Sequence, residues 1–570
     1  MWWRDAVVYQ IYVRSFADSG IDGIGDLQGI AARLDHVVEL GVDAIWLTPF
    51  FPSPQRDHGY DVADYFDVEP TYGTLADIDE LIEACHRRGL RILADIVPNH
   101  CSSEHPWFRE ALAAGPGSPA RARFYFRDGR GAHGELPPNN WTAMFGGSAW
   151  TRVADGQWYV HSFSPWQPDF DWDSEEVAAM FDDVMRFWFD RGIDGFRVDA
   201  VSHLGKASGL PDAPEPPPGT PATGAVGHNP YMSHWPSAHD VWRRWRSFAD
   251  RYEREHTGRE IVCVAEAYTP GRIELLIDYV RPDEFHQAFS FDLLLAPWNP
   301  AVIRNAIEAT YSTFNSVGAS MTWTLNNHDT QRSVTRYGRA DATDASSWTG
   351  SNLIHSDGPV DVDLGTERAR AAAVLLAALP GSIYLYQGEE LGLPEVLDLP
   401  AQARTDPIYL RTEGREIGRD GCRVPIPWTT DPNTGYGFSN GPAQPWLPQP
   451  ENWGERSVAV ERRSEGSMLA LYRVALAHRR QLLAGDETLT WELPDQPDVV
   501  AFRRCDLLIV LNATSEPADL DLPADVEWEI VVSSRGDHAH PSVVPHDACV
   551  WLRARGVWPD GAPGTEQEAS

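Results

Sequence analysis

Two charged side chains interrupt a short apolar segment, GIDGFRVDAV, at residues 192–201. Its Val, Ile and Phe residues are typical of a β-strand, on which side chains two positions apart lie on the same face. Arg197 and Asp199 therefore share one face, while Phe196, Val198 and Ala200 share the other. Burying two ions costs several kcal/mol unless they are paired and hydrogen-bonded. The pair is thus either a structural ion bridge or part of a working site.

Polar side chains also follow other apolar segments, namely LRILADIVPNH, EIVCVAEAY and MTWTLNNHD. A lone buried histidine or aspartate is more often a satisfied structural group than a functional one. Groups of this kind after several segments are hard to explain as packing. The residues are Asp95, Asn99, His100, Glu266, Asn327, His328 and Asp329.

Three carboxylates around one cavity suit cleavage of a glycosidic bond. One attacks the anomeric carbon, one protonates the leaving oxygen, and further groups hold sugar hydroxyls as positive charge develops. Asp199, Glu266 and Asp329 are the candidates. Arg197 is expected to lower the pKa of Asp199 and keep it ionised, as a nucleophile requires. The sequence shows no Ser-His-Asp order, phosphate-binding glycine loop or dinucleotide fingerprint that would favour other chemistry.

The elements that must position these residues alternate between helices and strands. Apolar residues at helical spacing occupy 26–41, 74–89 and 174–192, and each stretch is followed by a strand-like segment. About eight such units over roughly 480 residues predict a (β/α)₈ TIM barrel, an α/β fold whose catalytic groups come from the C-terminal ends of its strands.

Two stretches interrupt the barrel pattern. Residues 101–169 predict a small domain inserted after the third strand, between barrel parts 1–100 and 170–484, and residues 485–570 predict a C-terminal β-sandwich domain. The proline-rich segment at 209–230 is either a solvated surface loop or a lid over the site.

The charge balance argues against nucleic acid and anionic membrane as partners. The chain has 47 basic and 83 acidic residues, a net charge of −36, whereas both partners require a basic surface. The six cysteines lie singly, no apolar run approaches the roughly 18 residues of a membrane span, and the N-terminus lacks the pattern of a signal peptide. We expect a cytoplasmic protein without an organic cofactor. Its oligomeric state stays open.

Four of the quoted motifs resemble a known enzyme family. DIVPNH, GFRVDAV, the glutamate of VAEAY and NNHD resemble the four signature regions of the α-amylase family of glycoside hydrolases, and QPDFDW resembles its additional region. The likeness covers about residues 3–555. Within the family, WWRDAVVYQIYVRSF, HGYDVADY, FGGSAW and RDGCRVPIPW resemble the bacterial exo-acting α-glucosidase and oligo-1,6-glucosidase branch.

The resemblance implies a role for each matching residue. Asp199 would be the nucleophile, Glu266 the general acid/base and Asp329 the carboxylate that binds ring hydroxyls. The remaining matches would bind the sugar: His100, Arg197 and His328 line its subsite, Asp57 and Tyr60 hold the non-reducing glucose, Arg423 pairs with Asp57 to close the pocket, and Phe145 and Phe163 form aromatic walls. The branch usually reads RTPMQW where this chain has RVPIPW, so Arg419 is an alternative to Arg423.

The residue after the nucleophile bears on linkage preference. In the family a valine there accompanies α-1,6 cleavage, and alanine or threonine accompanies α-1,4 cleavage. This chain has Ala200, which favours α-1,4 substrates such as maltose.

The loop DSGIDGIGD at 18–26 is a candidate metal site. Its aspartates lie four apart in a glycine-rich segment, and hard divalent cations prefer such oxygen ligands, although such a loop is often an ordinary turn. The resemblance implies a structural calcium or magnesium ion held by Asp18, Gly20, Asp22, Ile24 and Asp26.

The leading hypothesis is a retaining exo-α-glucosidase that hydrolyses α-1,4-linked glucose from maltose and short glucosides, with glucosyl transfer as a side reaction. An oligo-1,6-glucosidase, or a trehalose synthase-type isomerase using the same triad, is the alternative within the family. The segment 202–239 would separate them through the shape of the acceptor site. A non-catalytic binding protein of related fold is the alternative of another class, disfavoured by the intact triad and the missing membrane span.

Overall fold

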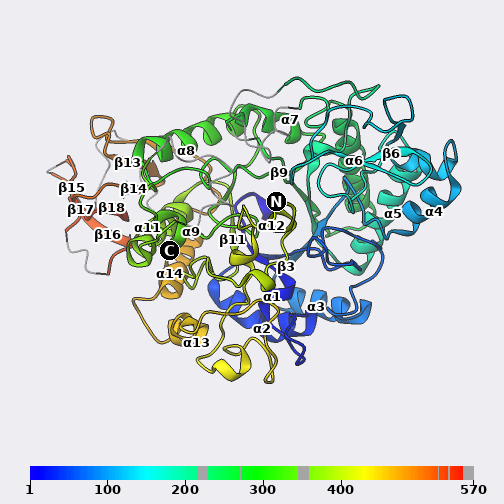
Figure 1. Cartoon of the computed structure of the whole chain (residues 1–570). Helices are drawn as coiled ribbons and strands as arrows, with labels where there is room; N and C mark the ends of the chain where they lie inside the picture. Colours follow the sequence, from blue (N-terminus) through cyan, green and yellow to red (C-terminus); the bar gives the residue numbers. More distant parts are fainter. Residues whose placement is uncertain (216–228, 270, 345–357, 524, 537–539, 556–570) are drawn as a thin grey trace.

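The computed structural model describes residues 1–215, 229–269, 271–344, 358–523, 525–536 and 540–555. Eight parallel strands form a nearly closed barrel in the order β10-β11-β1-β2-β3-β7-β8-β9, and a bridge between Ser290 and Trp323 joins the two ends (Figure 1). The predicted (β/α)₈ barrel is confirmed. Its strands are β1 (Val7–Ile11), β2 (Ala44–Leu47), β3 (Arg91–Ile96), β7 (Gly195–Val198), β8 (Val262–Ala265), β9 (Gln287–Ala288), β10 (Thr322–Thr324) and β11 (Ser382–Tyr386).

Helices connect the strands and surround the barrel (Figure 1). Local signals in the sequence set their ends: α2 begins where the Asp26 carboxylate accepts the Gly29 N–H, and it stops at Gly41, whose φ of 89° is left-handed. The helices of the barrel are α1 (Val13–Phe16), α2 (Leu27–Leu40), α3 (Leu75–Arg87), α5 (Glu175–Arg191), α6 (Ala238–Glu255), α7 (Leu276–Tyr279), α8 (Pro300–Asn315), α9 (Ser333–Tyr337), α11 (Val362–Ala378), α12 (Pro407–Arg411), α13 (Val458–Glu461) and α14 (Met468–Leu482). Within the described ranges, no helix is both long and apolar enough to cross a membrane.

A small β-sheet interrupts the barrel between β3 and β7. It follows the helix α4 (Pro106–Ala114) and contains β4 (Phe126–Asp128), β5 (Trp150–Arg152) and β6 (Gln157–Val160) in the antiparallel order β4-β6-β5. An antiparallel bridge between His100 and Asp169 closes the segment where it leaves and rejoins the barrel. The insertion therefore begins and ends beside the predicted site.

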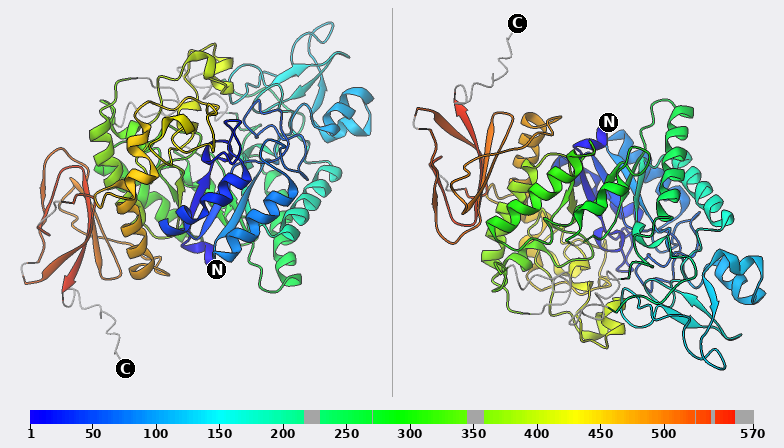
Figure 2. Two further views of the ribbon diagram at one scale, coloured as in Figure 1. Left: turned by 90° about the horizontal axis from the view of Figure 1, so that it is seen from below. Right: turned by 90° about the horizontal axis from the view of Figure 1, so that it is seen from above.

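The chain after α14 forms antiparallel sheets at the opposite end of the molecule from the inserted sheet (Figure 2). The Trp551 indole N–H donates to the Val374 carbonyl at 3.1 Å, which joins them to α11. The larger sheet contains β12 (Thr490–Trp491), β13 (Val499–Arg504), β14 (Leu507–Asn512), β16 (Glu527–Ser533) and β18 (Ala548–Arg555), and the smaller one β15 (Ala518–Asp519) and β17 (Val543–Val544). The domain limits remain predictions. Of the segment 209–230, predicted as a loop or lid, residues 216–228 lie outside the described residues.

Candidate active site

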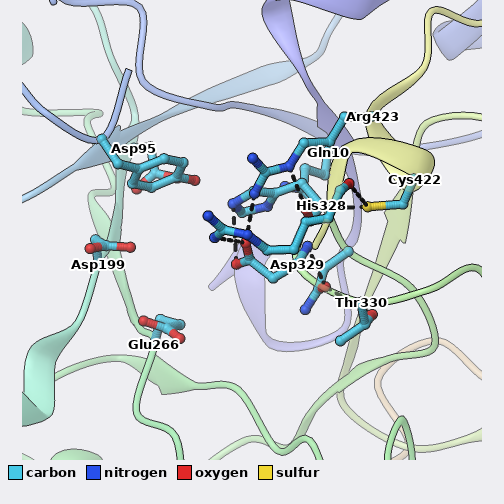
Figure 3. Close-up of polar contacts among 12 residues, drawn as sticks. Gln10, Asp95, Asp199, Glu266, His328, Asp329, Thr330, Cys422 and Arg423 are labelled. Carbon is cyan, nitrogen blue, oxygen red and sulfur yellow. Dashed lines mark hydrogen bonds and ion pairs between the residues drawn. The ribbon is translucent and has the colours of Figure 1, made fainter. Parts of the chain in front are cut away.

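Four carboxylates lie at the C-terminal ends of the barrel strands. Asp95 belongs to β3, Asp199 directly follows β7, Glu266 directly follows β8, and Asp329 lies in the loop after β10. Figure 3 shows Asp199 and Glu266 facing Asp329 across the site. The structure therefore brings together the three carboxylates predicted to be catalytic.

Arg197 connects three of these carboxylates. Its Nη1 lies 2.9 Å from Asp95 Oδ1 and 2.7 Å from Asp199 Oδ1, and its Nη2 lies 3.6 Å from Glu266 Oε2. Asp95 also accepts hydrogen bonds from the Tyr60 hydroxyl at 2.9 Å and from the Trp46 indole at 3.2 Å. Asp95 and Asp199 therefore share Nη1 of the guanidinium, and Glu266 lies near Nη2.

Burial decides the protonation of this group. It raises the pKa of Asp199 well above the ordinary value; Arg197 opposes the rise, and Glu266 adds to it. Burial likewise raises the pKa of Glu266 to about 6, against the opposing effects of Arg197 and the Ala200 N–H. Arg197 does lower the pKa of Asp199, as expected, but one guanidinium shared among three buried carboxylates does not offset their desolvation, so the net shift is opposite to the expected one.

Asp329 has a different environment because two arginines bind it. Arg419 Nη1 lies 2.8 Å and Arg423 Nη2 lies 3.0 Å from Asp329 Oδ1. Burial opposes ionisation of Asp329, but His328, Arg419 and Arg423 outweigh it and hold the pKa of this carboxyl well below its ordinary range. Asp329 is therefore the carboxylate that remains charged most readily in this site.

The partner of Asp57 is Arg419, which corrects the prediction that Arg423 fills this role. Arg419 Nη2 lies 3.0 Å from Asp57 Oδ1, and Arg419 Nε lies 2.6 Å from Asp406 Oδ2. Arg423 instead donates from Nε to the His328 carbonyl at 2.8 Å. Arg419 therefore contacts three carboxylates, those of Asp57, Asp329 and Asp406. Arg423, four residues later in a 3₁₀ turn, contacts Asp329 at 3.0 Å and Asp406 at 3.7 Å.

Two buried histidines are held as neutral hydrogen-bond donors. The Gln10 amide contacts His328 Nδ1 at 2.6 Å, which leaves the proton on Nε2, 3.2 Å from Asp329 Oδ2. Burial lowers the pKa of His328 well below its ordinary value and that of His100 to about 4. The Tyr60 ring stacks on His328 with centroids 5.2 Å apart. His100 Nε2 lies 3.1 Å from the Tyr60 carbonyl, so the N–H groups of both neutral histidines have acceptors within the protein.

Two aromatic side chains from the inserted segment complete one wall. The rings of Phe145 and Phe163 lie 5.6 Å apart, and Phe163 lies 5.0 Å from the ring of His100. The Arg419 guanidinium lies 5.1 Å from the centre of the Phe145 ring. The inserted segment therefore packs directly against the residues that bind Asp57 and Asp329.

Comparison with known proteins identifies the family. Residues 10–485 match the family model described as "Alpha amylase, catalytic domain". The chain belongs to the α-amylase family of glycoside hydrolases. A "Probable alpha-glucosidase" of Rhizobium meliloti (strain 1021) is 38% identical over 498 residues, 84% of this chain and 82% of the relative.

Other relatives match over greater lengths. The "Oligo-1,6-glucosidase" of Parageobacillus thermoglucosidasius is 32% identical and covers 94% of this chain and 95% of the relative. A crystal structure titled as an alpha-glucosyl transfer enzyme has a TM-score of 0.83 and 34% sequence identity, covering 97% of this chain and 99% of that chain. The similarity to α-amylase family members therefore includes the inserted and C-terminal sheets as well as the barrel.

Several residues that support the site were not predicted from the sequence as part of it. The Asp406 carboxylate binds Arg419 and also caps α12 through the Ile408 N–H at 2.7 Å. The Gln167 amide donates to Asp57 Oδ2 at 2.9 Å. Long-range pairs of this kind have no periodic signal in the sequence.

A buried ion pair joins the inserted segment to the loop after the nucleophile. Lys206 Nζ lies 2.9 Å from Asp169 Oδ2, and both side chains are fully buried. Asp169 also accepts the Ser162 N–H at 2.9 Å, one residue before the aromatic wall at Phe163. Lys206 is the only lysine in the chain. That uniqueness is the sequence signal that could have identified Lys206 as a residue supporting the site.

The loop at 18–26 forms the start of α2. Asp26 Oδ1 accepts the Gly29 N–H and Oδ2 accepts the Ser19 N–H at 2.9 Å, while Asp18 Oδ2 accepts the Gly23 N–H at 3.0 Å. The three aspartates do not converge, since no group of three or more carboxylate, histidine or cysteine ligands for a metal occurs in the described part of the chain. Asp26 acts as the cap of α2 and is bound by the main chain through both carboxylate oxygens, so its predicted role as a metal ligand is not supported by its contacts.

Proposed function

We propose that this α-amylase family member is a retaining exo-α-glucosidase that removes single glucose units from the non-reducing ends of maltose and short α-1,4 glucosides. The observation that carries the proposal is the set of three carboxylates around Arg197 and Arg419, at the ends of β7, β8 and β10. The names of the relatives, α-glucosidase and oligo-1,6-glucosidase, support the same substrate class.

In this mechanism Asp199 attacks the anomeric carbon while Glu266 protonates the leaving oxygen. A covalent glucosyl intermediate forms on Asp199, and water activated by Glu266 then releases glucose with its configuration retained. The positive charge that develops on the sugar adds to the single guanidinium that Asp199 shares with Asp95 and Glu266. Ionised Asp199 is therefore favoured most strongly in the transition state.

Asp329 would hold the sugar ring, with the two neutral histidines beside it. Asp329 remains ionised through Arg419 and Arg423, so it can accept hydrogen bonds from two ring hydroxyls. His328 orients Asp329 through its Nε2–H, and His100 lies on the wall near Asp57. These contacts favour a glucose unit with free hydroxyls, not the middle of a polymer.

The Asp57–Arg419 pair supports cleavage from the chain end. Arg419 joins Asp57 to Asp329, and Asp406 and Gln167 bind the pair in turn, so a sugar held by Asp329 would meet this network of buried charges at its non-reducing end. Any hydroxyl that reaches the intermediate can replace water, so glucosyl transfer is proposed as a side reaction. The small side chain of Ala200 beside Asp199 supports an α-1,4 preference.

The test is an NMR time course with equal maltose and isomaltose. Faster loss of maltose with α-glucose as the first anomer is the expected result, and Asp199→Asn should abolish it. Faster loss of isomaltose would contradict the linkage preference, and trehalose accumulating with little free glucose would indicate an isomerase. Equal activity of Asp199→Asn and the wild type would refute the catalytic assignment.

Two accompanying proposals concern the setting of the enzyme. A structural calcium or magnesium ion at 18–26 would rest on Asp18, Asp22 and the carbonyls of Gly20 and Ile24, with Asp26 orienting the loop. A cytoplasmic location is supported by six free cysteines, five of them buried, which suit a reducing compartment. Cell fractionation and metal analysis of the purified protein would test these proposals.

A further inference from the structure

Ala200 has an unusual backbone conformation next to the nucleophile. Its φ of 49° and ψ of 36° are left-handed, and only 5% of the residue is exposed. For an L-residue other than glycine this conformation costs on the order of 1 kcal/mol, so it persists where surrounding contacts impose it. The contacts around Ala200 therefore indicate what the conformation is for.

Those contacts connect the nucleophile strand to Glu266. The Ala200 N–H donates to Glu266 Oε2 at 2.8 Å. On either side of it, the Glu266 N–H donates to the Val198 carbonyl at 3.0 Å, and the Val201 N–H donates to the Glu266 carbonyl at 3.2 Å. The main chain at 198–201 thus binds both the backbone and the side chain of Glu266, and the left-handed turn at Ala200 directs its N–H at the carboxyl group.

We infer that Ala200 is a positioning residue whose main-chain N–H fixes Oε2 of Glu266 as a hydrogen-bond acceptor and leaves Oε1 to carry the catalytic proton. This rests on the proposed role of Glu266 as general acid. The Ala200 N–H and the Arg197 guanidinium both approach Oε2, at 2.8 and 3.6 Å. A proton on Oε2 would face two donors, so the acidic form carries its proton on Oε1.

The same contact tunes the acid strength of Glu266. A hydrogen bond to the ionised carboxylate favours the ionised form. Its loss therefore shifts the alkaline limb of kcat/KM to higher pH, because Glu266 stays protonated longer. The contact depends on the main-chain N–H and on the left-handed φ that directs it at Glu266, so removing the N–H itself is the direct test.

Replacing the Ala200 N–H by an ester oxygen separates the hydrogen bond from the side chain. Lactic acid, incorporated at 200 by nonsense suppression, keeps the methyl group but has no N–H to donate to Glu266. Ala200→Gly adopts a left-handed φ without cost and keeps the N–H, so it is the matched control.

The experiment measures pH profiles of kcat/KM for maltose in the wild type, Ala200→Gly and the enzyme with the ester at 200. We expect the alkaline limb of the ester enzyme to move upward by about half to one pH unit, and that of Ala200→Gly to stay with the wild type. α-Glucosyl fluoride, whose leaving group needs little protonation, should show no such shift. An ester at 201 removes the N–H that bonds the Glu266 carbonyl, so it is the control for a general loss of main-chain hydrogen bonding in this turn.

The results distinguish this inference from the proposed function. An unmoved limb in the enzyme with the ester at 200, or an equal shift with the ester at 201, would overturn the role of Ala200. Full maltose activity in Glu266→Gln would instead overturn the assignment of Glu266 itself. If Glu266→Gln loses both activity and the limb while the ester at 200 leaves the limb unmoved, only the inference about Ala200 fails.

Discussion

Replacing Glu266 by glutamine should stabilise the folded protein while it removes activity. Burial raises the pKa of Glu266 from 4.5 to about 6, although the side chain is 21% exposed. That rise corresponds to about 2 kcal/mol of disfavoured ionisation. Glutamine keeps the shape and can still accept the Ala200 N–H through its carbonyl oxygen, but it has no charge to desolvate.

The sign of the effect gives it a characteristic pH dependence. Because the folded-state pKa is the higher one, the protonated form is favoured on folding, and this contribution is complete below about pH 4.5. It is lost as pH rises through about 6, where the folded wild type must hold the buried charge. The stability advantage of Glu266→Gln should therefore be near zero at pH 4.5 and reach about 2 kcal/mol at pH 8.

Calorimetry and kinetics test the two sides of this prediction. Near the unfolding transition about 2 kcal/mol corresponds to a rise of about 2 °C in Tm for a chain of this length. The exposed Glu255→Gln, at the end of α6, is the control for a simple change of net charge. Maltose kcat/KM should fall by about 10²–10⁴-fold. A Tm difference that does not grow with pH, or one equal to that of the control, would refute the reasoning.

Three further changes test other parts of the site and its support. Arg419→Lys should lower maltose kcat/KM at least tenfold, mainly through KM, because an ammonium group cannot span three carboxylates. Lys206→Met should destabilise the protein by about 3–5 kcal/mol in calorimetry, since it leaves Asp169 buried without a counter-ion, and adding Asp169→Asn should restore much of this stability. If the loop at 18–26 binds a cation, chelation should lower the wild-type Tm, calcium should restore it, and Asp18→Asn should respond to neither.

The catalytic carboxylates could be predicted because the barrel places them by a rule. Asp199 and Glu266 directly follow predicted strands, and strand ends of a (β/α)₈ barrel converge on one face. In that architecture Asp199 and Glu266 are expected to be neighbours although they lie 67 residues apart in the chain. Asp329 lies in a loop after β10, and its role was predicted from the family motif more than from its distance along the chain from a strand.

The choice between the two arginines could not be made from the sequence. Arg419 immediately precedes a 3₁₀ turn and Arg423 is its last residue, so both side chains reach the same region. Which one binds Asp57 depends on Asp406, which holds Arg419 Nε from the start of α12. That contact arises from how two loops pack, and neither loop has a periodic pattern that would reveal it.

The protonation of Asp199 was mispredicted for a related reason. The two-residue spacing on a strand correctly predicted that Arg197 lies beside Asp199. It could not predict how many other carboxylates contact the same guanidinium. Asp95 also binds the guanidinium of Arg197, and Glu266 lies near it, so both compete with Asp199 for its charge. The electrostatics of the pair are therefore a property of the cluster and depend on its burial.

Sharing one guanidinium among three carboxylates has a functional consequence. If Arg197 bound Asp199 alone, the nucleophile would be ionised at little cost, but it would also be neutralised and less reactive toward the sugar. Shared with Asp95 and Glu266, the guanidinium leaves the site short of positive charge until the oxocarbenium-like sugar supplies it. The cost of holding these carboxylates ionised before charge develops on the sugar is thus recovered in the transition state. This explains why removing one of them should stabilise the fold and abolish the reaction together.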